Sequence, residues 1–182
     1  MQNDSLWIDQ LRRGDLEGLR RIYDRYSIDL FRIAACLLAD PVDAEDCLHD
    51  VFVTLATSAA RLNLDGDLKG YLVTCIVHRV RAWQTRDRRR SGLSLTDVQD
   101  FLDCRTPDAA DLAADREQAA SLYKALAGLP YEQREVITLH LHGQMTFQEV
   151  AERQGLSINT VQSRYRYGLE KLRAALATEV QK

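Results

Sequence analysis

The stretch from Ser157 to Tyr167 carries side chains suited to binding a nucleic acid. It reads SINTVQSRYRY. As a helix, it would place its apolar residues on one face and its polar residues on the other. Hydroxyl, amide and guanidinium groups bond phosphates and the base edges in the major groove of DNA. The candidates on the polar face are Asn159, Thr160, Gln162, Ser163, Arg164 and Arg166.

A helix-turn-helix pattern would position these side chains. Thr146 and Glu149 have the spacing of a capping box, which begins a helix. Gly155 ends that helix, and Ser157 is a suitable N-cap for the next one. Two helices joined by a three-residue turn form a DNA-binding arrangement. The alternative is an ordinary helical hairpin with a solvated polar face. The small residue Ala151 at the expected crossing and the short turn favour DNA binding.

The charge of the chain is unevenly distributed. The 182 residues include 24 Lys+Arg and 27 Asp+Glu, a net charge of −3. Residues 61–90 hold eight basic and three acidic residues, whereas residues 91–117 hold two basic and seven acidic ones. A net acidic chain is a poor general binder of nucleic acid, so the basic segment and the helix-turn-helix are the expected contact regions.

Cysteine and histidine spacing predicts neither disulfides nor a metal site. The four cysteines form no CxxC pair, which indicates reduced thiols in a cytoplasmic protein. His140 and His142 are two residues apart on an expected helix, so they point about 200° away from each other. We find no catalytic constellation, no cofactor motif, no signal peptide and no apolar run of membrane-spanning length. We therefore expect a cytoplasmic protein that is not an enzyme, needs no cofactor or metal and is not inserted in a membrane.

Helical periodicity extends along nearly the whole chain, so the predicted fold class is all-α. Two small helical domains are expected, at 1–90 and 112–182, joined by a flexible acidic linker at 91–111. In the first domain, a helix at about 42–58 bears an acidic face beside an apolar ridge. A turn at 63–67 separates it from a long basic helix. Helices at 112–129 and 131–141 precede the helix-turn-helix.

Three motifs in order resemble the extracytoplasmic-function (ECF) sigma factors of the sigma-70 superfamily. LPYEQREV at 129–136 is similar to the opening of the family's fourth sigma domain. DAEDCLHDVFVTLA at 43–56 resembles the family's polymerase-docking segment, and YLVTCIVHRVRAWQTRDRRR at 71–90 its promoter-melting helix. The resemblance covers nearly everything outside the linker. It implies that the domains are a sigma-2-like bundle and a sigma-4-like helix-turn-helix domain.

The resemblance also implies partners and sites. The partners would be the β′ and β subunits of bacterial RNA polymerase core, promoter DNA, and an anti-sigma factor held between the two domains. Docking on the β′ coiled coil would use Asp46, Asp50, Val51, Phe52 and Leu55, although the last three equally suit a helical core. Recognition and melting of the −10 element would use Arg61, Asn63, Leu64, Asp65, Lys69, Thr74, His78, Arg79 and Arg81. At the −35 element, Arg153, Ser157 and Tyr167 would contact phosphates beside the six readers above.

Departures from the family pattern all lie on the −10 side. Tyr71, His78 and Ala82 stand where the family usually has Trp, Asn and Asp. Tyr71 and Trp83 would stack on bases or pack in the core, since their spacing suits both. One alternative function is a stand-alone helix-turn-helix regulator that binds an operator without polymerase. Another is a protein-interaction module in which the helix-turn-helix no longer binds DNA.

Overall fold

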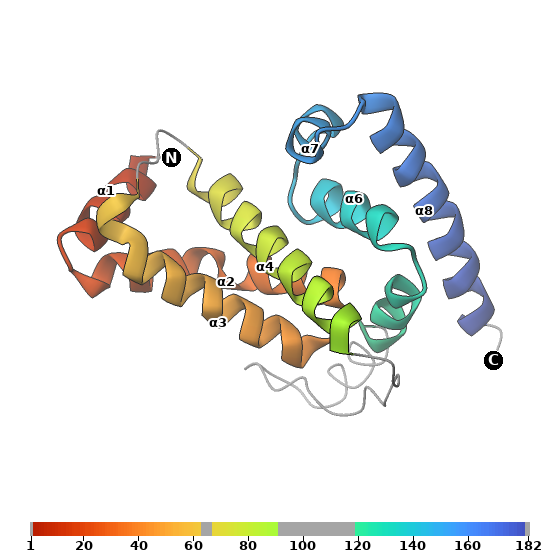
Figure 1. Cartoon of the computed structure of the whole chain (residues 1–182), viewed down its shortest axis with the longest axis horizontal. Helices are drawn as coiled ribbons and strands as arrows, with labels where there is room; N and C mark the ends of the chain where they lie inside the picture. Colours follow the sequence, from red (N-terminus) through yellow and green to blue (C-terminus); the bar gives the residue numbers. More distant parts are fainter. Residues whose placement is uncertain (1, 63–66, 91–118, 181–182) are drawn as a thin grey trace. The chain divides into compact units, whose positions relative to one another are not determined.

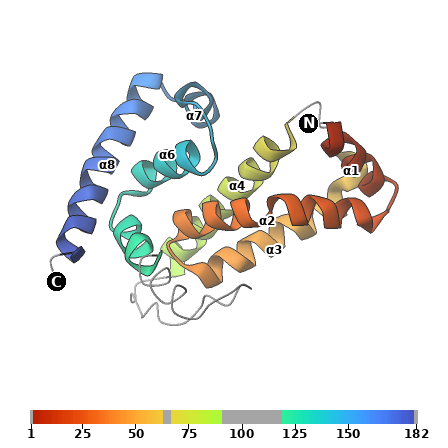
Figure 2. The same ribbon diagram turned by 180° about the vertical axis from the view of Figure 1, so that it is seen from behind.

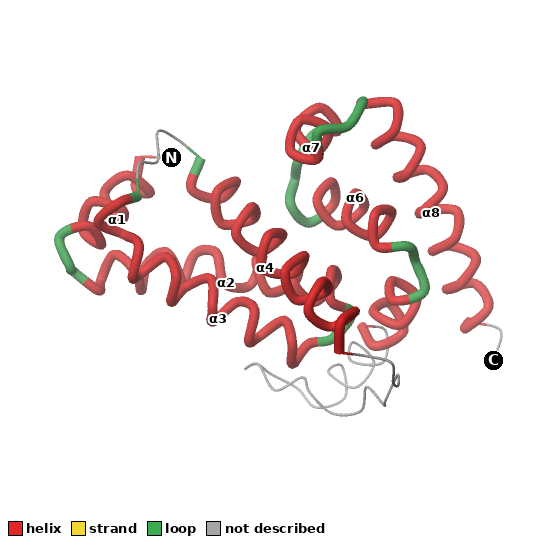
Figure 3. The backbone as a smooth tube through the Cα atoms, viewed as in Figure 1, coloured by secondary structure: helices red, strands yellow, loops and turns green. Residues whose placement is uncertain are grey.

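The computed structural model describes residues 2–62, 67–90 and 119–180. Every regular element in these ranges is a helix (Figures 1 and 3), which confirms the predicted all-α class. The chain divides into two compact units. Of the described residues, the first unit contains 2–34, 43–62 and 67–90, and the second contains 35–42 and 119–180. The predicted linker, 91–111, lies outside the described residues.

The first unit is a bundle of helices. It comprises α1 (Gln2–Arg12), most of α2 (Leu16–Leu38) and of α3 (Pro41–Ser58), the short 3-10 helix η1 (Ala59–Arg61) and α4 (Leu68–Arg90). Helices α2, α3 and α4 lie side by side in both Figure 1 and Figure 2, while α1 packs against η1. Fully buried side chains fill the bundle: Ile22, Leu30, Ile33, Leu55, Leu68, Leu72, Ile76 and Val80.

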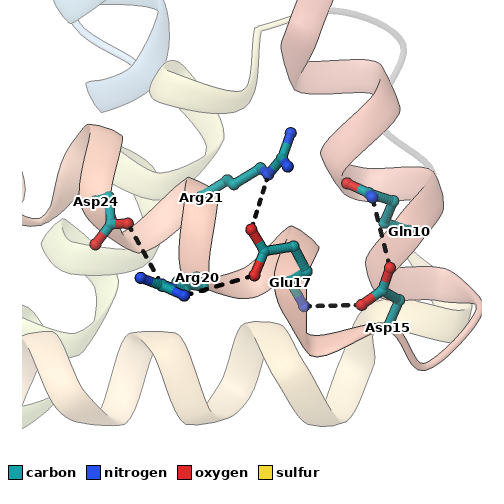
Figure 4. A network of polar contacts seen from close by, with 6 residues as sticks. All are labelled: Gln10, Asp15, Glu17, Arg20, Arg21 and Asp24. Atoms are coloured by element: carbon teal, nitrogen blue, oxygen red, sulfur yellow. Dashed lines mark hydrogen bonds and ion pairs between the residues drawn. The ribbon is translucent and has the colours of Figure 1, made fainter.

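Polar side chains fix the start of α2 (Figure 4). Asp15 caps the helix because its carboxylate accepts a hydrogen bond of 2.9 Å from the backbone N–H of Glu17. Gln10 of α1 donates to the same carboxylate at 3.5 Å. Arg21 and Arg20 pair with Glu17 at 3.1 and 3.9 Å, and Arg20 also reaches Asp24. The junction between α1 and α2 is therefore tied by side chains from both helices.

The second unit holds the helix-turn-helix. A helix at 119–127 precedes α6 (Tyr131–Leu141), α7 (Phe147–Gln154) and α8 (Ile158–Val180). The helix predicted at 112–129 is thus described only from residue 119, and the predicted helix at 131–141 is confirmed. Helix α8 packs along both α6 and α7, over a core that includes Leu126, Leu129, Ile137 and Leu172.

The described cysteines, a residue type that can react or bind metal in other proteins, pack inside the protein. Cys36 and Cys47 are buried and Cys75 is half-buried, all as free thiols. Burial raises the pKa of Cys36 to about 11 and that of Cys47 to about 12, so both remain protonated and unreactive at neutral pH. Within the described ranges, no three His, Cys, Asp or Glu side chains are grouped so as to hold a metal ion. No described helix is long and apolar enough to cross a membrane.

Candidate functional site

The capping box predicted at Thr146 begins α7. The Thr146 hydroxyl oxygen accepts from the Glu149 backbone N–H at 3.2 Å, and the Glu149 carboxylate accepts from the Thr146 backbone N–H at 2.7 Å. These bonds satisfy two amides that a helix start would otherwise leave without acceptors. They also hold the pKa of the exposed Glu149 carboxyl below its usual value, with the bond from the Thr146 backbone contributing most.

We expect Thr146→Ala to lower the free energy of unfolding of the second unit by about 0.5–2 kcal/mol, because an N-cap hydroxyl is lost. The loss should shrink on acidification, because Thr146→Ala also removes the 2.8 Å bond from the Thr146 hydroxyl to the Glu149 carboxylate, and protonation of that carboxyl weakens this bond. The pKa of Glu149 is depressed in the folded state, so its stabilising effect is complete above the unfolded pKa of about 4.3 and disappears as the pH falls through the folded value. Urea unfolding at pH 7 and pH 3 would measure both effects. Thr146→Ser, which keeps the hydroxyl, is the control and should retain most of the stability at pH 7.

The turn between α7 and α8 has the predicted geometry. Gly155 is left-handed, with φ 64°, and its backbone N–H bonds the carbonyls of Ala151 and Glu152. Ser157 caps α8, since its hydroxyl accepts from the Thr160 backbone N–H at 3.2 Å. The chain therefore ends one helix and begins the next within three residues, as in a helix-turn-helix.

Packing fixes the angle between the two helices. Val150, Ala151 and Val161 are buried where α7 meets α8. Beside them, the ring of His140 stacks on Phe147 at 4.2 Å, and both rings meet Tyr165 edge-on at 5.0 and 5.1 Å. The His140 Nδ1 also lies 2.7 Å from the Met145 carbonyl oxygen. His140 is thus a packing residue that joins α6, α7 and α8.

The predicted −35 readers separate into an outer face and a flank of α8. Asn159, Gln162 and Arg166 are exposed, and their spacing places them within about 60° of one another around the helix. We call these three the outer face. Ser163 is half-buried beside it. Thr160 and Arg164 lie on the flank, both half-buried.

The flanking groups and predicted phosphate contacts have partners of their own. The Thr160 hydroxyl lies 2.8 Å from that of Ser157, and Arg164 donates to the Gln154 side-chain oxygen of α7 at 3.5 Å. Tyr167 is exposed and lies 4.9 Å beneath the Arg166 guanidinium. Arg153 is half-buried on α7.

The predicted −10 residues are only partly free. Arg61 is exposed at the end of η1 and His78 is exposed on α4, whereas Arg81 is half-buried. The other described members have internal partners: Lys69 pairs with Asp29 at 3.2 Å, and the Thr74 hydroxyl donates to the Gly70 carbonyl at 2.7 Å. Asn63, Leu64 and Asp65 lie outside the described residues.

Arg79 and Asp50 were predicted to face different partners, yet they bind each other. The Arg79 Nε donates to Asp50 Oδ2 at 2.9 Å, and its Nη2 contacts the same oxygen. The pair joins α3 to α4 and is about one-third exposed. Helical periodicity gave the face of each residue but could not reveal a partner 29 positions away.

The predicted docking face on α3 combines exposed acid with a buried ridge. Asp46 is exposed, but Val51, Phe52 and Leu55 are buried and belong to the core of the first unit. A docking role for these three residues stays a prediction, and the free chain offers little of their surface. Sequence reasoning overlooked exposed Val53 and half-exposed Tyr23, whose ring lies against Phe52 at 4.9 Å.

Tyr71 and Trp83 are both half-buried on α4. Burial raises the pKa of Tyr71 to about 12, aided by a hydrogen bond with Cys75. Tyr71 is thus engaged inside the unit, and stacking of either ring on a base stays a prediction.

Family models match both units. The model for Sigma-70 region 2 matches residues 22–90, and the model for Sigma-70, region 4 matches residues 125–174. Together they define a protein of the sigma-70 class. The chain is 30% identical over 131 residues to the ECF RNA polymerase sigma factor RpoE of Cereibacter sphaeroides, covering 71% of this chain and 70% of that protein. The chain belongs to the ECF sigma factors, so the stand-alone regulator is not its class.

Two further comparisons agree. The chain is 27% identical over 172 residues to the ECF RNA polymerase sigma factor SigK of Mycobacterium ulcerans, covering 92% of this chain and 90% of that protein. Its fold is similar to the sigma factor RpoE of Bartonella quintana, solved with the anti-sigma factor NepR. The TM-score is 0.64 at 22% identity, covering 87% of this chain and 98% of that one.

Proposed function

We propose that this chain binds RNA polymerase core in the cytoplasm and directs it to promoters with −35 and −10 elements, without a catalytic site of its own. The observation that carries the proposal is the outer face of α8. Asn159, Gln162 and Arg166 project from a capped helix whose opposite side is fixed by Val161 in the core. A helix held in this way can enter the major groove with its readers in register.

Asp46 is the centre of the proposed polymerase-docking face. Its carboxylate is exposed, and Val53, two turns further along the same side of α3, adds apolar surface that is 47% exposed. A basic helical partner such as the β′ coiled coil of polymerase would complement both. Asp50 supports this face from the side through its bond to Arg79.

The −10 element is assigned to the end of η1 and the exposed side of α4. Arg61 and His78 are available in the free chain, whereas Lys69 and Arg79 must exchange an acidic partner for phosphate. Both pairs are partly open to solvent, and a phosphate can take the place of the carboxylate when DNA binds. An anti-sigma factor is the proposed regulator, because the similar sigma factor of Bartonella quintana was solved in complex with one.

Run-off transcription tests the proposal. Core polymerase with this chain should produce specific transcripts from a subset of promoter fragments, and core alone should not. Arg166→Ala should lower their yield severalfold at limiting protein, because a specific Arg contact to a base is worth about 1–3 kcal/mol. Transcripts would be measured on denaturing gels across a titration of the chain.

Arg173→Ala is the matched control. Arg173 is exposed on the same side of α8, two turns beyond Arg166. Its removal changes the charge equally but should leave promoter choice and yield unchanged. Absence of any polymerase-dependent transcript with cognate core would contradict the proposed function. Equal losses in both variants would show a general charge effect and contradict the reader role of Arg166.

A further inference from the structure

Arg12 lies on α1, a helix with no assigned role, and contacts the end of η1, where the predicted −10 region begins. Helix α1 lies before the region matched by the Sigma-70 region 2 model, and no predicted site residue lies on it. The Arg12 Nε donates to the Leu62 carbonyl oxygen at 3.0 Å, and its Nη2 donates to the same oxygen. Leu62 follows Arg61 directly and ends η1.

Both ends of this contact are held firmly. The Arg12 Nη1 is 3.0 Å from the Asp9 carboxylate, which fixes the plane of the guanidinium. Leu62 is buried, and its backbone N–H bonds the Ala59 carbonyl at 3.1 Å. A guanidinium presents several donors in one rigid plane, so two of them can orient a single carbonyl. A lysine ammonium cannot reproduce that geometry.

Helix α1 gives Arg12 a rigid base. Ile8 and Leu11 are buried, and the Tyr26 hydroxyl of α2 contacts both carboxylate oxygens of Asp4 at 3.0 Å. The C-terminal end of α1 is held to the start of α2 by the bond from Gln10 to Asp15 (Figure 4). Arg12 therefore holds η1 in a fixed position relative to α1 and α2.

We propose that Arg12 is a positioning residue for −10 recognition: it fixes the end of η1, and with it exposed Arg61, against α1 and α2, to which α4 is also bound through the pair of Lys69 and Asp29. This inference rests on the proposed function. Arg61 enters the proposed DNA surface from η1, while His78 enters it from α4, and the two segments are not one helix. Specific recognition needs contacts placed within a fraction of an ångström, so the anchor of η1 controls discrimination more than it controls overall affinity.

The test uses holoenzyme assembled from cognate core and full-length chain. The probe is a DNA library with randomised segments at the −35 and −10 distances, and bound DNA is sequenced. Arg12→Met removes the donors and keeps an apolar stem. Arg12→Lys keeps the charge. Arg13→Met, at the exposed neighbouring arginine, is the matched control.

We expect Arg12→Met to reduce enrichment of the −10 motif about five- to tenfold, a loss comparable to that of one mismatched base pair. Enrichment of the −35 motif, which the second unit reads, should match that of the unchanged protein. Arg12→Lys should give an intermediate value, and Arg13→Met should give none of the loss. Backbone amide exchange at Leu62 in the free chain should be faster in Arg12→Met, independently of DNA.

Three results would overturn the inference. The first is a −10 motif as sharp in Arg12→Met as in the unchanged protein. The second is an equal decline of both motifs, which would reveal loss of folding or of polymerase docking instead of positioning. The third is a library in which even the unchanged holoenzyme enriches neither motif. That result would contradict the proposed function itself. It is distinguished from the first two results because it appears in the unchanged protein, without any variant.

Discussion

Asp46→Arg is expected to lower the affinity of this chain for RNA polymerase core by about a hundredfold or more. Asp46 is exposed at the centre of the proposed docking face of α3, where the expected partner is basic. Reversal replaces an attraction by a like-charge contact that costs several kcal/mol, and each 1.4 kcal/mol is about tenfold in affinity. Fluorescence anisotropy of labelled chain titrated with core would measure the change.

Glu45→Arg provides the matched control. Glu45 is exposed on the same helix and changes the net charge identically, but it points about 100° away from Asp46. Its variant should bind core within about twofold of the unchanged protein if the face is as narrow as one row of side chains. Equal losses in both variants would indicate long-range charge attraction without a defined face. Full affinity in Asp46→Arg would place the docking surface elsewhere.

Gly168→Leu is expected to destabilise the second unit by about 1–3 kcal/mol or more, because it overpacks the contact between α6 and α8. A Cβ at Gly168 would lie 2.7 Å from Ile137 Cδ1 and 3.2 Å from Gln133 Cβ. The Ile137 methyl can turn aside, but the Gln133 Cβ is fixed to its backbone, so a longer side chain must separate the helices. Urea unfolding followed by circular dichroism, together with binding to −35 DNA, would measure the effect.

Ala175→Leu adds a leucine at an exposed position of the same helix, seven residues further on. It should leave stability nearly unchanged, since the added side chain meets solvent. Gly168→Ala should lie between the two, because the gain in helix propensity of about 1 kcal/mol offsets part of the crowding. A Gly168→Leu protein as stable as the control would mean that α6 and α8 separate at little cost.

The helix-turn-helix was predictable because its signals are local. Thr146 and Glu149 are three residues apart, and each forms the bond that the other needs. Gly155 adopts the left-handed conformation that its position after a helix demanded, and Ser157 caps the next helix as expected. The outer face of α8 followed from a period of 3.6 residues. Such features depend on neighbours along the chain, which a sequence displays directly.

The pairing of side chains across helices was not predictable. Periodicity placed Asp50 and Arg79 on plausible surfaces, but their bond depends on how α3 and α4 pack. The same limit applies to Phe52, where a ridge that suited a partner is buried in the unit itself. Arg12 carries no local motif, so its bond to Leu62 becomes visible only in three dimensions.

The separation between Arg12 and Leu62 has a consequence for the order of folding. Their contact closes a loop of 50 residues, whereas the capping box of α7 closes within three. Closing long loops costs more entropy, and contacts distant in sequence slow folding. On the ribosome, α1 is made before η1, so Arg12 has no Leu62 carbonyl to bind until about fifty more residues have been added, several seconds later at about 5–20 residues per second. The bond between Arg12 and Leu62 therefore cannot form until most of the first unit has been synthesised, although α1 is made well before η1.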